Sequence, residues 1–249
     1  MRYFSSIEVV IFVCMKNDKN LIAIIGDIHG CYNTLFILYA RIITLGVKKV
    51  YSVGDLIDRG RYSKEAVQFC IDKGIKPVKG NHEDMMILAV DKPDRKEYLI
   101  YGHSNKEMYL FNGCNKTMIS YVKSDYEEDF DAFREEIKRT GHFDYLNNLP
   151  MKLEVENVVI SHAGIVKGEP EVKWLWNRDI PSKLDKYQVF GHTSRNECTI
   201  AEHYACIDTG CVYGRKLSAL IIDSVTAKIE NIISEPLNLR DEKYTVNYN

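Results

Sequence analysis

Short apolar runs alternate with segments of helical periodicity along the first third of the chain. Three apolar runs, each typical of a buried strand, occupy residues 21–26, 48–54 and 75–80. Segments in which apolar residues recur every three or four positions follow these runs, at 31–46, 63–74 and 82–90. This order of strand, helix, strand, helix, strand predicts a parallel sheet with helices packed against it.

The remainder of the chain divides into a helical segment and a strand-rich segment. Residues 91–148 are polar, rich in tyrosine and mostly of helical periodicity, which predicts a helical insertion. Six short apolar runs follow, at 151–156, 157–161, 187–191, 203–208, 217–223 and 227–233. Because no helix separates them, we expect antiparallel pairing in a second sheet. The pattern predicts one α/β domain over 20–233, between an N-terminal extension (1–19) and a polar C-terminal tail (234–249).

Composition and charge narrow the class of protein. The 249 residues are 45% hydrophobic, and 33 Lys and Arg against 35 Asp and Glu give a net charge of −2. This balance argues against nucleic acid or an anionic membrane as a partner, and no apolar run reaches the ~20 residues that span a bilayer. The seven cysteines contain no C-x-x-C pair, which indicates reduced thiols in a cytoplasmic protein. Apolar residues 7–15 include Glu8 and lack a following cleavage site, so they do not match a signal peptide.

Side chains of the metal-ligand type follow five of the predicted strands. In each case an apolar run stops at one small residue and is followed by ligand-type residues: Asp27 and His29, Asp55, Asn81 and His82, His162, and His192. In open α/β sheets, ligands bind beyond the carboxyl ends of the strands. Imidazole, carboxylate and amide groups supply the N and O donors that suit Mn, Fe and Zn. The set exceeds the four ligands of a tetrahedral ion, which favours two ions that share a bridging carboxylate.

Other candidate residues lack this shared context. Histidines are more often structural than ligating, and we expect that of His103, His142 and His203. Asp208 in the DTG sequence is expected to form a turn. Cys31 has no activating partner in the sequence and is expected to be a packing residue. Trp174 and Trp176 fit a hydrophobic core better than a substrate groove.

Five short motifs carry a family resemblance, and they occur in the family's order. The motifs are GDIHG (26–30), GDLIDRG (54–60), GNHE (80–83), SHAG (161–164) and GHT (191–193). The chain resembles the phosphoprotein phosphatase branch of the calcineurin-like metallophosphoesterases over most of 20–222, and only loosely in 91–148. Its size, WNR at 176–178 and IDTG at 207–210 are similar to the compact bacterial and bacteriophage (lambda-type) serine/threonine phosphatases. The resemblance implies a sandwich of two mixed β-sheets flanked by helices.

The resemblance also implies two metal-binding positions. Asp27 and His29 match ligands of a first metal, and Asp55 matches the ligand that bridges both metals. The ligands implied for the second metal are Asn81, His162 and His192. The implied cofactors are two divalent ions, with Mn²⁺ expected first and Fe or Zn as alternatives.

Four further residues match catalytic positions of the family. His82 matches the general acid and Asp58 the carboxylate that supports it. Arg59 and Arg178 match the two phosphate-binding arginines. The implied reaction is hydrolysis of a phosphomonoester by direct attack of a hydroxide that bridges the two ions, while His82 protonates the leaving group.

Three functions compete. The favoured one is a protein serine/threonine phosphatase that acts on a phosphoprotein or phosphopeptide. The second is a dinucleoside polyphosphate hydrolase similar to the symmetrical bis(5'-nucleosyl)-tetraphosphatases. By resemblance, that group tends to lack the second Asp of GDLIDRG and to have Asp after GNH, so Asp58 and Glu83 favour the first function. The third is an inactive binding module, which would be expected to lack ligands or the acid, and none is missing.

Overall fold

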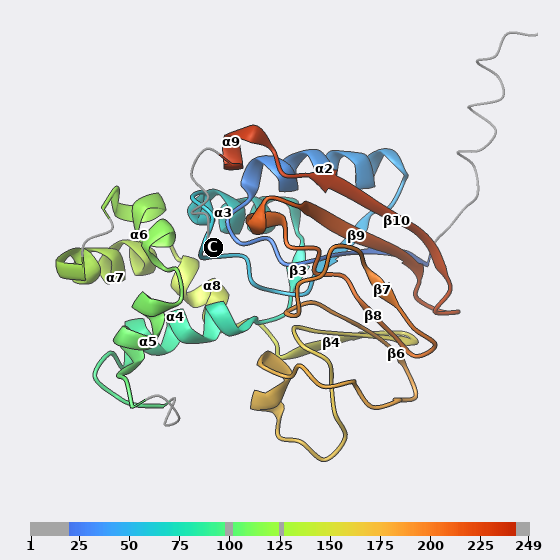
Figure 1. Ribbon diagram of the computed structural model, residues 1–249. Coiled ribbons are helices and arrows are strands. Elements are labelled where there is room, and N and C mark those ends of the chain that lie inside the picture. The colour runs from blue at the N-terminus through green and yellow to red at the C-terminus, as the bar shows by residue number, and fades with distance from the viewer. Residues whose placement is uncertain (1–19, 98–101, 125–126, 243–249) are drawn as a thin grey trace, which may run out of the picture.

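Two five-stranded β-sheets form one part of the structure, and a group of helices lies beside them (Figure 1). The computed structural model describes residues 20–97, 102–124 and 127–242. Both sheets contain parallel and antiparallel neighbours. The predicted α/β architecture of two mixed sheets flanked by helices is therefore confirmed.

The first sheet begins with the predicted parallel strands. These are β1 (Leu21–Ile25), β2 (Lys49–Ser52) and β3 (Lys76–Pro77). The helices that follow them are α2 (Tyr32–Thr44), α3 (Ser63–Lys73) and α4 (Asn81–Asp91). Gly74 adopts the left-handed conformation that ends α3, at the position where the sequence predicted the end of that helix.

The same sheet continues with two strands that the sequence assigned elsewhere. β9 (Lys216–Asp223) pairs antiparallel with β1, and β10 (Ile229–Pro236) pairs antiparallel with β9. The sequence placed both strands in the second sheet, which is wrong. The alternation of apolar residues indicates that a strand is buried, but it carries no information about which sheet edge the strand joins.

The second sheet has the order β4-β5-β6-β8-β7. Its strands are β4 (Lys152–Val155), β5 (Val158–Ser161), β6 (Tyr187–Phe190), β8 (Tyr204–Cys206) and β7 (Thr199–Ile200). β5, β6 and β8 run parallel to one another. Among the six predicted runs, the expected antiparallel pairing therefore holds for β4 with β5 and for β9 with β10. β7, which the sequence did not predict, pairs antiparallel with β8. The crossover from β5 to β6 is a long loop with one short 3-10 helix, η4 (Glu171–Leu175), and such a loop allows parallel strands without an α-helix.

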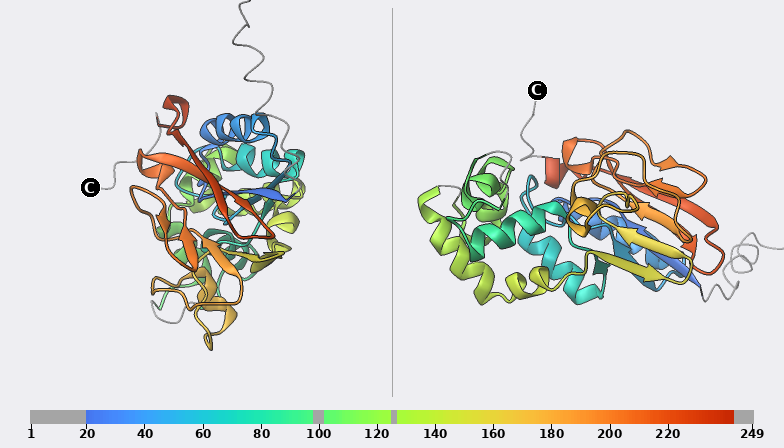
Figure 2. Two further views of the ribbon diagram at one scale, coloured as in Figure 1. Left: turned by 90° about the vertical axis from the view of Figure 1, so that its right-hand side faces the viewer. Right: turned by 90° about the horizontal axis from the view of Figure 1, so that it is seen from below.

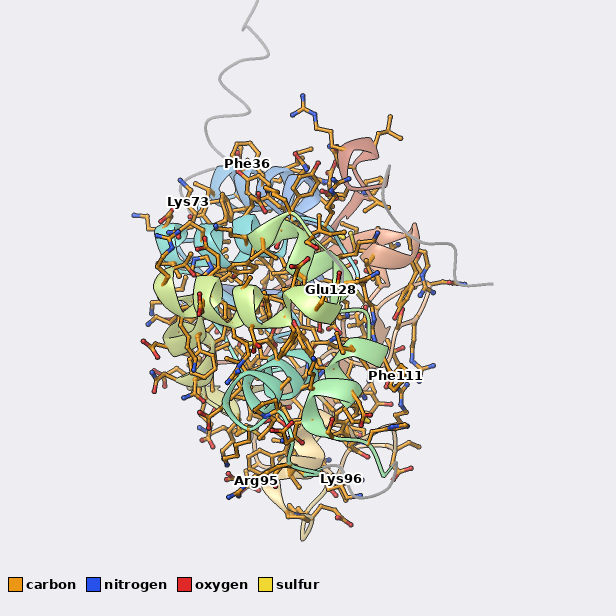
Figure 3. The ribbon with its side chains drawn as sticks, turned by 90° about the vertical axis from the view of Figure 1, so that its left-hand side faces the viewer. Phe36, Lys73, Arg95, Lys96, Phe111 and Glu128 are labelled. Carbon is orange, nitrogen blue, oxygen red and sulfur yellow. The ribbon has the colours of Figure 1, made fainter. Side chains whose placement is uncertain are left out.

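The predicted insertion is helical in the residues that the structure describes. It contains α5 (Asn105–Phe111), α6 (Asn115–Val122), the 3-10 helix η3 (Glu127–Asp129), α7 (Phe130–Arg139) and α8 (His142–Asn147). Tyr109 stacks on Phe133, and Phe130 packs against both rings. Figure 2 shows these helices grouped beside the sheets, and Figure 3 views the molecule from their side, with Phe111 and Glu128 on the outer surface.

Two apolar cores hold these layers together. One lies between the sheets, where Ile24 and Val53 of the first sheet meet Ile160 of the second. The other lies between the first sheet and the helices and continues into the insertion, through residues such as Leu38 and Phe133. Within residues 20–97, 102–124 and 127–242, no helix is long and apolar enough to cross a membrane.

The described structure continues past residue 233, where the sequence placed the start of a polar C-terminal tail. β10 runs to Pro236, and the short helix α9 (Leu239–Glu242) packs beside α2 (Figure 1). The Asp241 carboxylate accepts hydrogen bonds from the backbone N–H and hydroxyl of Thr34, at 2.8 and 2.7 Å. This buried contact carries the fold to residue 242. The predicted extension at 1–19 and the remainder of the tail lie outside the described residues.

His142, predicted to be structural, gives a stability prediction. Its Nδ1 accepts from the Tyr121 hydroxyl (2.6 Å) and its Nε2–H donates to Gln68 Oε1 (3.0 Å), an arrangement that requires the neutral ring. Burial lowers the His142 pKa from 6.5 to about 4. The unfolded chain therefore binds the proton first as the pH falls, and this stabilisation, complete above pH 6.5, is lost between pH 6.5 and 4.

We therefore expect the difference in unfolding free energy between wild type and His142→Asn to shrink by about 2–3 kcal/mol from pH 7 to pH 4. Urea denaturation of both proteins in EDTA, at several pH values, measures this difference. Two parallel pH profiles would contradict the prediction.

Candidate metal centre

The strand ends bring the ten predicted site residues together. Asp27 and His29 follow β1, and the loop after β2 carries Asp55, Asp58 and Arg59. The remaining five begin α4 or follow strands β5 and β6: Asn81, His82, His162, Arg178 and His192. The distances below place these side chains around one centre, except Arg178, which reaches it by lining the same cavity as Asp55 and Arg59.

The Asp55 side chain lies between two groups of ligand-type atoms. Asp55 Oδ2 lies 3.4 Å from His29 Nε2 and 3.6 Å from His162 Nε2. Ligand atoms of Asp27, Asp55 and His162 lie within 4.8 Å of one another. On the second side, Asn81 Oδ1 lies 2.8 Å from His162 Nε2 and 3.1 Å from His192 Nδ1. This is the placement that a shared carboxylate between two ions requires.

The orientation of two imidazole rings fits a cation on each side of Asp55. His29 Nδ1 donates to the Ile57 carbonyl at 2.8 Å, and His162 Nδ1 donates to the Val53 carbonyl at 2.9 Å. The Nε2 atom of each ring then presents a lone pair to the site, and both atoms face Asp55 Oδ2. His162 Nε2 also faces the Asn81 amide oxygen. Lone pairs and carboxylate oxygens converge favourably around a positive charge. Arg59 Nη1 supplies one such charge, 2.6 Å from His29 Nε2.

The electrostatics of the buried groups agree with this fit. Burial, reinforced by Asp208 and Asp55, raises the pKa of Asp27 well above its usual value. Burial raises the pKa of Asp55 to about 7, and Asp208 adds to the shift while Arg59 opposes it. Burial lowers the pKa of His162 to about 4, so its ring is neutral at pH 7 and its lone pair is available. Divalent cations would stabilise both carboxylates in their charged form.

The backbone is strained where these side chains enter the site. Among the described residues, eight other than glycine have positive φ, and five of them belong to the site: His29, Asp55, Asp58, Arg59 and His192. Such conformations cost of order 1–3 kcal/mol each and persist where the surrounding structure enforces them. Their concentration here indicates that the loops are shaped for a site and not for stability.

Two glycines allow the close approach of the loops. A Cβ at Gly80 would lie 2.1 Å from Asp55 Oδ1, and a Cβ at Gly191 would lie 2.0 Å from Asp27 Oδ1. Any larger residue at either position would displace a carboxylate that points into the site. The glycines of GNHE and GHT therefore serve the geometry of the neighbouring strand ends.

His82 and Asp58 form a buried pair beside this centre. His82 Nδ1 lies 2.7 Å from Asp58 Oδ2, and both side chains are fully buried. His82 Nε2 has no hydrogen-bond partner among the described residues. With Nδ1 held by the carboxylate, His82 has Nε2 available for proton transfer.

A cavity of about 240 Å³ lies at the candidate metal centre. Arg59 and Arg178 line it together with Asp55, Asn81 and His192. Other lining residues were not assigned to a site from the sequence, and these include Asn112, Thr193, Ser194, Asp208 and Tyr213. Cationic groups beside a candidate metal centre suit an anionic ligand such as phosphate.

A comparison with known protein families shows which family this chain belongs to. The model of the calcineurin-like phosphoesterases matches residues 21–218, which include all ten site residues. The chain belongs to the calcineurin-like phosphoesterase family. The family that the motifs indicated is therefore confirmed.

Relatives of this phosphoesterase are named as dinucleoside tetraphosphatases, which correspond to the second of the three functions considered from the sequence. It is 26% identical to the asymmetrical bis(5'-nucleosyl)-tetraphosphatase PrpE of Oceanobacillus iheyensis, over 80% of this chain and 87% of that one. It is also 26% identical to the symmetrical bis(5'-nucleosyl)-tetraphosphatase of Methylobacillus flagellatus, over 80% of this chain and 91% of that one. These names differ from the phosphoprotein phosphatase branch that the motifs favoured.

Solved structures share the fold of the phosphoesterase. A putative diadenosine tetraphosphatase superposes with a TM-score of 0.61 at 22% identity, and the match covers 88% of this chain and 95% of that one. A protein serine/threonine phosphatase from Saccharomyces cerevisiae, similar to human PP5, gives 0.55 at 12% identity, with 89% and 81% covered. At these identities the likeness concerns the fold.

Residues outside the motif positions behave mostly as the sequence predicted. Cys31 is buried against the His29 carbonyl. His103 lies beside the Glu107 carboxylate, and His203 contacts the Pro181 carbonyl. Asp208 forms the predicted turn through a hydrogen bond from Gly210 N to its Oδ1, at 2.8 Å. Asp208 is also buried and lines the cavity, which the sequence analysis missed. The available signal in the sequence was that Asp208 follows a strand, as the candidate ligands do.

Glu83 has a structural task that its position after GNH did not reveal. Its carboxylate accepts hydrogen bonds from the backbone N–H groups of Asp55 (2.9 Å), Leu56 (2.8 Å) and Gly80 (2.9 Å). Burial raises the Glu83 pKa to about 8, and Asp55 contributes to the shift. Glu83 thus joins the two loops that carry Asp55 and Asn81, and it is a poor guide to substrate class.

Substitution of this carboxylate is expected to destabilise the phosphoesterase. Above pH 8, where the Glu83 carboxylate is charged, Glu83→Gln places an NH₂ group against backbone donors, so we expect the unfolding free energy to fall by about 2 kcal/mol. Glu235→Gln is the matched control, because Glu235 forms an exposed ion pair with Arg41 and should change stability by no more than about 0.5 kcal/mol. Urea denaturation in EDTA compares the two, and equal effects would contradict the role of Glu83.

Proposed function

We propose that this phosphoesterase hydrolyses dinucleoside polyphosphates of the bis(5'-nucleosyl)-tetraphosphate class. The observation that carries the proposal is the match, along most of both chains, to tetraphosphatases of the symmetrical and asymmetrical types. A complete set of ligand-type side chains and a cavity lined by two arginines support hydrolysis at a phosphoryl group. The partner is then a nucleotide and not a phosphoprotein.

Six residues would hold the two metal ions. His29 lies on one side of Asp55, and Asn81, His162 and His192 lie on the other, while Asp27 groups with Asp55 and His162. Two divalent ions held there would supply positive charge to the phosphoryl oxygens and lower the pKa of an attacking water. This mixture of imidazole, carboxylate and amide donors suits Mn²⁺, with Fe and Zn as alternatives.

The protein's own groups bind the phosphate and handle the proton. Arg59 and Arg178 line the cavity and would donate to phosphate oxygens, which fixes the phosphoryl group and balances its charge. His82 would donate from Nε2 to the departing oxygen. Asp58, bonded to His82 Nδ1, holds the ring in orientation. Burial, reinforced by Arg59, lowers the pKa of His82 well below its usual value, and an ionised Asp58 would oppose that shift.

Phosphomonoester hydrolysis is a second candidate, and a specific observation favours it. A seryl or threonyl oxygen leaves poorly unless it is protonated, whereas a nucleotide phosphate needs less assistance. The buried His82–Asp58 pair supplies such assistance. Two residues favoured a protein phosphatase from the sequence. Asp58 still supports that function, whereas Glu83 supports it little because its hydrogen bonds to the backbone explain its presence.

A comparison of substrates tests both candidates. The purified protein with Mn²⁺ is assayed on diadenosine tetraphosphate, a phosphoserine/phosphothreonine peptide and a phosphotyrosine peptide, with an EDTA arm for each. We expect kcat/KM to be at least about tenfold higher for the dinucleotide. Formation of ADP alone indicates symmetrical cleavage, and AMP with ATP indicates asymmetrical cleavage. A preference for either peptide makes the second candidate the function, and inactivity on all three with Mn²⁺, Fe²⁺ or Zn²⁺ defeats both.

A further inference from the structure

A second cavity, of about 250 Å³, adjoins the first one. Trp176 and Arg178 line both cavities, so these two residues form the boundary between them. The second cavity is otherwise lined by Gly164, Val166, Glu169, Lys173, Trp174, Asn177 and Asp179. A molecule whose phosphate lies between Arg59 and Arg178 would therefore have the second cavity beside it, across Trp176.

The walls of the second cavity are held to the strand end that carries His162. The backbone N–H of Ala163 donates to the Trp174 carbonyl at 2.7 Å. Asn177 Nδ2 donates to the Gly164 carbonyl at 2.7 Å, and the backbone N–H of Asp179 donates to Asn177 Oδ1 at 3.0 Å. These bonds connect both sides of the cavity to the loop after β5, so the cavity is formed before a ligand arrives.

The chemistry of the lining favours a neutral aromatic group over a second phosphate. The sequence assigned Trp174 and Trp176 to a hydrophobic core; Trp176 does pack against the core, but both residues also line this cavity and supply aromatic surface. Lys152 Nζ lies over the Trp174 ring, 5.5 Å from its centroid. Lys173 and Arg178 are balanced in number by Glu169 and Asp179, so the lining has no net charge. The carboxylates at its edge would repel a phosphate but can accept hydrogen bonds from exocyclic amino groups.

We infer that this second cavity, bounded by Trp174 and Trp176, binds a nucleobase of the substrate. The inference rests on the proposed function insofar as the substrate is a nucleotide. The phosphate binds between the arginines, and the base of the same nucleotide stacks on an indole ring. Stacking of a base on an aromatic side chain contributes about 1–3 kcal/mol, which corresponds to roughly a 5- to 150-fold change in affinity.

Product inhibition tests this site without relying on dinucleotide hydrolysis. Hydrolysis of p-nitrophenyl phosphate reports on the catalytic centre, while AMP and ribose 5-phosphate compete as inhibitors that differ only by the base. We expect AMP to inhibit the wild type about tenfold more strongly than ribose 5-phosphate does. Trp174→Leu removes the ring from the second cavity alone and should abolish this difference.

Two more variants separate loss of the base site from loss of structure. Val172→Ala is the matched control on the same 3-10 helix, because Val172 is exposed and does not line the cavity. It should keep the tenfold difference. Val166→Trp should fill the cavity and abolish the difference while leaving the walls in place.

The outcomes distinguish this site from the proposed function. Equal inhibition of the wild type by AMP and ribose 5-phosphate overturns the base site, even if diadenosine tetraphosphate is hydrolysed. A base-dependent difference that Trp174→Leu and Val166→Trp both preserve also overturns it. If the difference behaves as expected but the phosphopeptide is the better substrate, the base site stands and the proposed function fails.

A different observation carries a second inference, which holds for any phosphate substrate. Two residues of the insertion bind the remaining oxygen of Asp58: Thr117 Oγ1 donates to Asp58 Oδ1 at 2.7 Å, and the Tyr109 hydroxyl donates to it at 3.0 Å. The backbone N–H of Asp58 also donates to Thr117 Oγ1 at 2.9 Å. All three side chains are fully buried.

The geometry assigns Tyr109 and Thr117 as positioning residues for the general acid. Both donors bind Oδ1, which leaves Oδ2 directed at His82 Nδ1, 2.7 Å away. The insertion thus orients Asp58, and Asp58 orients His82. Loss of either donor would let the carboxylate rotate, and outer contacts of this kind typically change activity by about 10–100-fold.

The dependence on the leaving group tests this role. Tyr109→Phe should lower kcat about tenfold on an alkyl phosphate and less than about twofold on p-nitrophenyl phosphate, whose leaving group departs unprotonated. Tyr121→Phe is the matched control, because it removes a buried hydroxyl that binds His142 in the same insertion. It should affect both substrates equally.

Thr117 provides a rescue experiment. Thr117→Val should reproduce the selective loss on the alkyl phosphate, and Thr117→Ser, which keeps the hydroxyl, should restore activity to within about threefold. Equal losses on both substrates in Tyr109→Phe and Thr117→Val would reduce the two residues to a purely structural role.

Discussion

Replacement of Asp55 by asparagine is expected to lower kcat by at least about 10³-fold on every phosphate substrate. Asp55 Oδ2 lies between His29 Nε2 and His162 Nε2, so one carboxylate faces both halves of the site. Asparagine has a single side-chain oxygen and no negative charge, so it can neither bridge two cations nor balance them. Steady-state kinetics with Mn²⁺ on diadenosine tetraphosphate and p-nitrophenyl phosphate measure the loss.

Thermal unfolding gives a second readout of the same substitution. A bound metal stabilises the folded state by mass action, so Mn²⁺ should raise the Tm of the wild type and leave that of Asp55→Asn nearly unchanged. Asp223→Asn is the control, because it makes the same chemical change at an exposed turn. If Asp55→Asn keeps the Mn²⁺-dependent rise in Tm together with most of its activity, Asp55 is not the shared ligand.

The second large effect is expected from His82→Asn, and it should depend on the leaving group. We expect kcat to fall about 10²–10⁴-fold on an alkyl phosphoserine substrate, where the departing oxygen must be protonated. The loss should be smaller on diadenosine tetraphosphate and on p-nitrophenyl phosphate, because those leaving groups depart more readily as anions. His82 fits this role because its Nε2 has no partner among the described residues while Asp58 holds its Nδ1.

Asp58→Asn should show the same order of losses with smaller magnitude, since the amide can hold the ring but cannot stabilise its charge. The Tm of each variant in EDTA controls for unfolding, because His82 and Asp58 are both buried. Losses of equal size on all three substrates would mean that His82 does not protonate the leaving group.

The metal-site residues were within reach of the sequence because their signal is local. Each candidate ligand directly follows an apolar run that ends in a small residue, as in GDIHG and GNHE. The chemistry of the side chain and the end of the strand are therefore written in the same few positions. The alternation of strands and helices in 21–90 is equally local, and it placed three strands and the helices that follow them correctly.

The sequence could not show which sheet each strand joins or which residues support the site, because both depend on contacts between residues distant in sequence. β9 pairs with β1, which precedes it by nearly two hundred residues, and β10 pairs with β9; nothing within β9 selects β1 as its partner. Glu83 binds the Asp55 loop, and Tyr109 and Thr117 bind Asp58 from the insertion, the segment that resembled the family only loosely. Their residue types are ordinary, so only their positions in space reveal the contacts.

By itself, therefore, the sequence determined the fold class, the ten candidate site residues and the family, because those features repeat within short motifs. The tertiary structure decided how the motifs are used. It showed that Asp55 lies between two groups of candidate ligand atoms, that the insertion binds the Asp58 carboxylate beside His82, and that a tryptophan-lined cavity without net charge shares Arg178 with the first cavity. The physical reason is that a hydrogen bond or a cavity wall forms between segments that only the complete packing of both sheets and the insertion brings together.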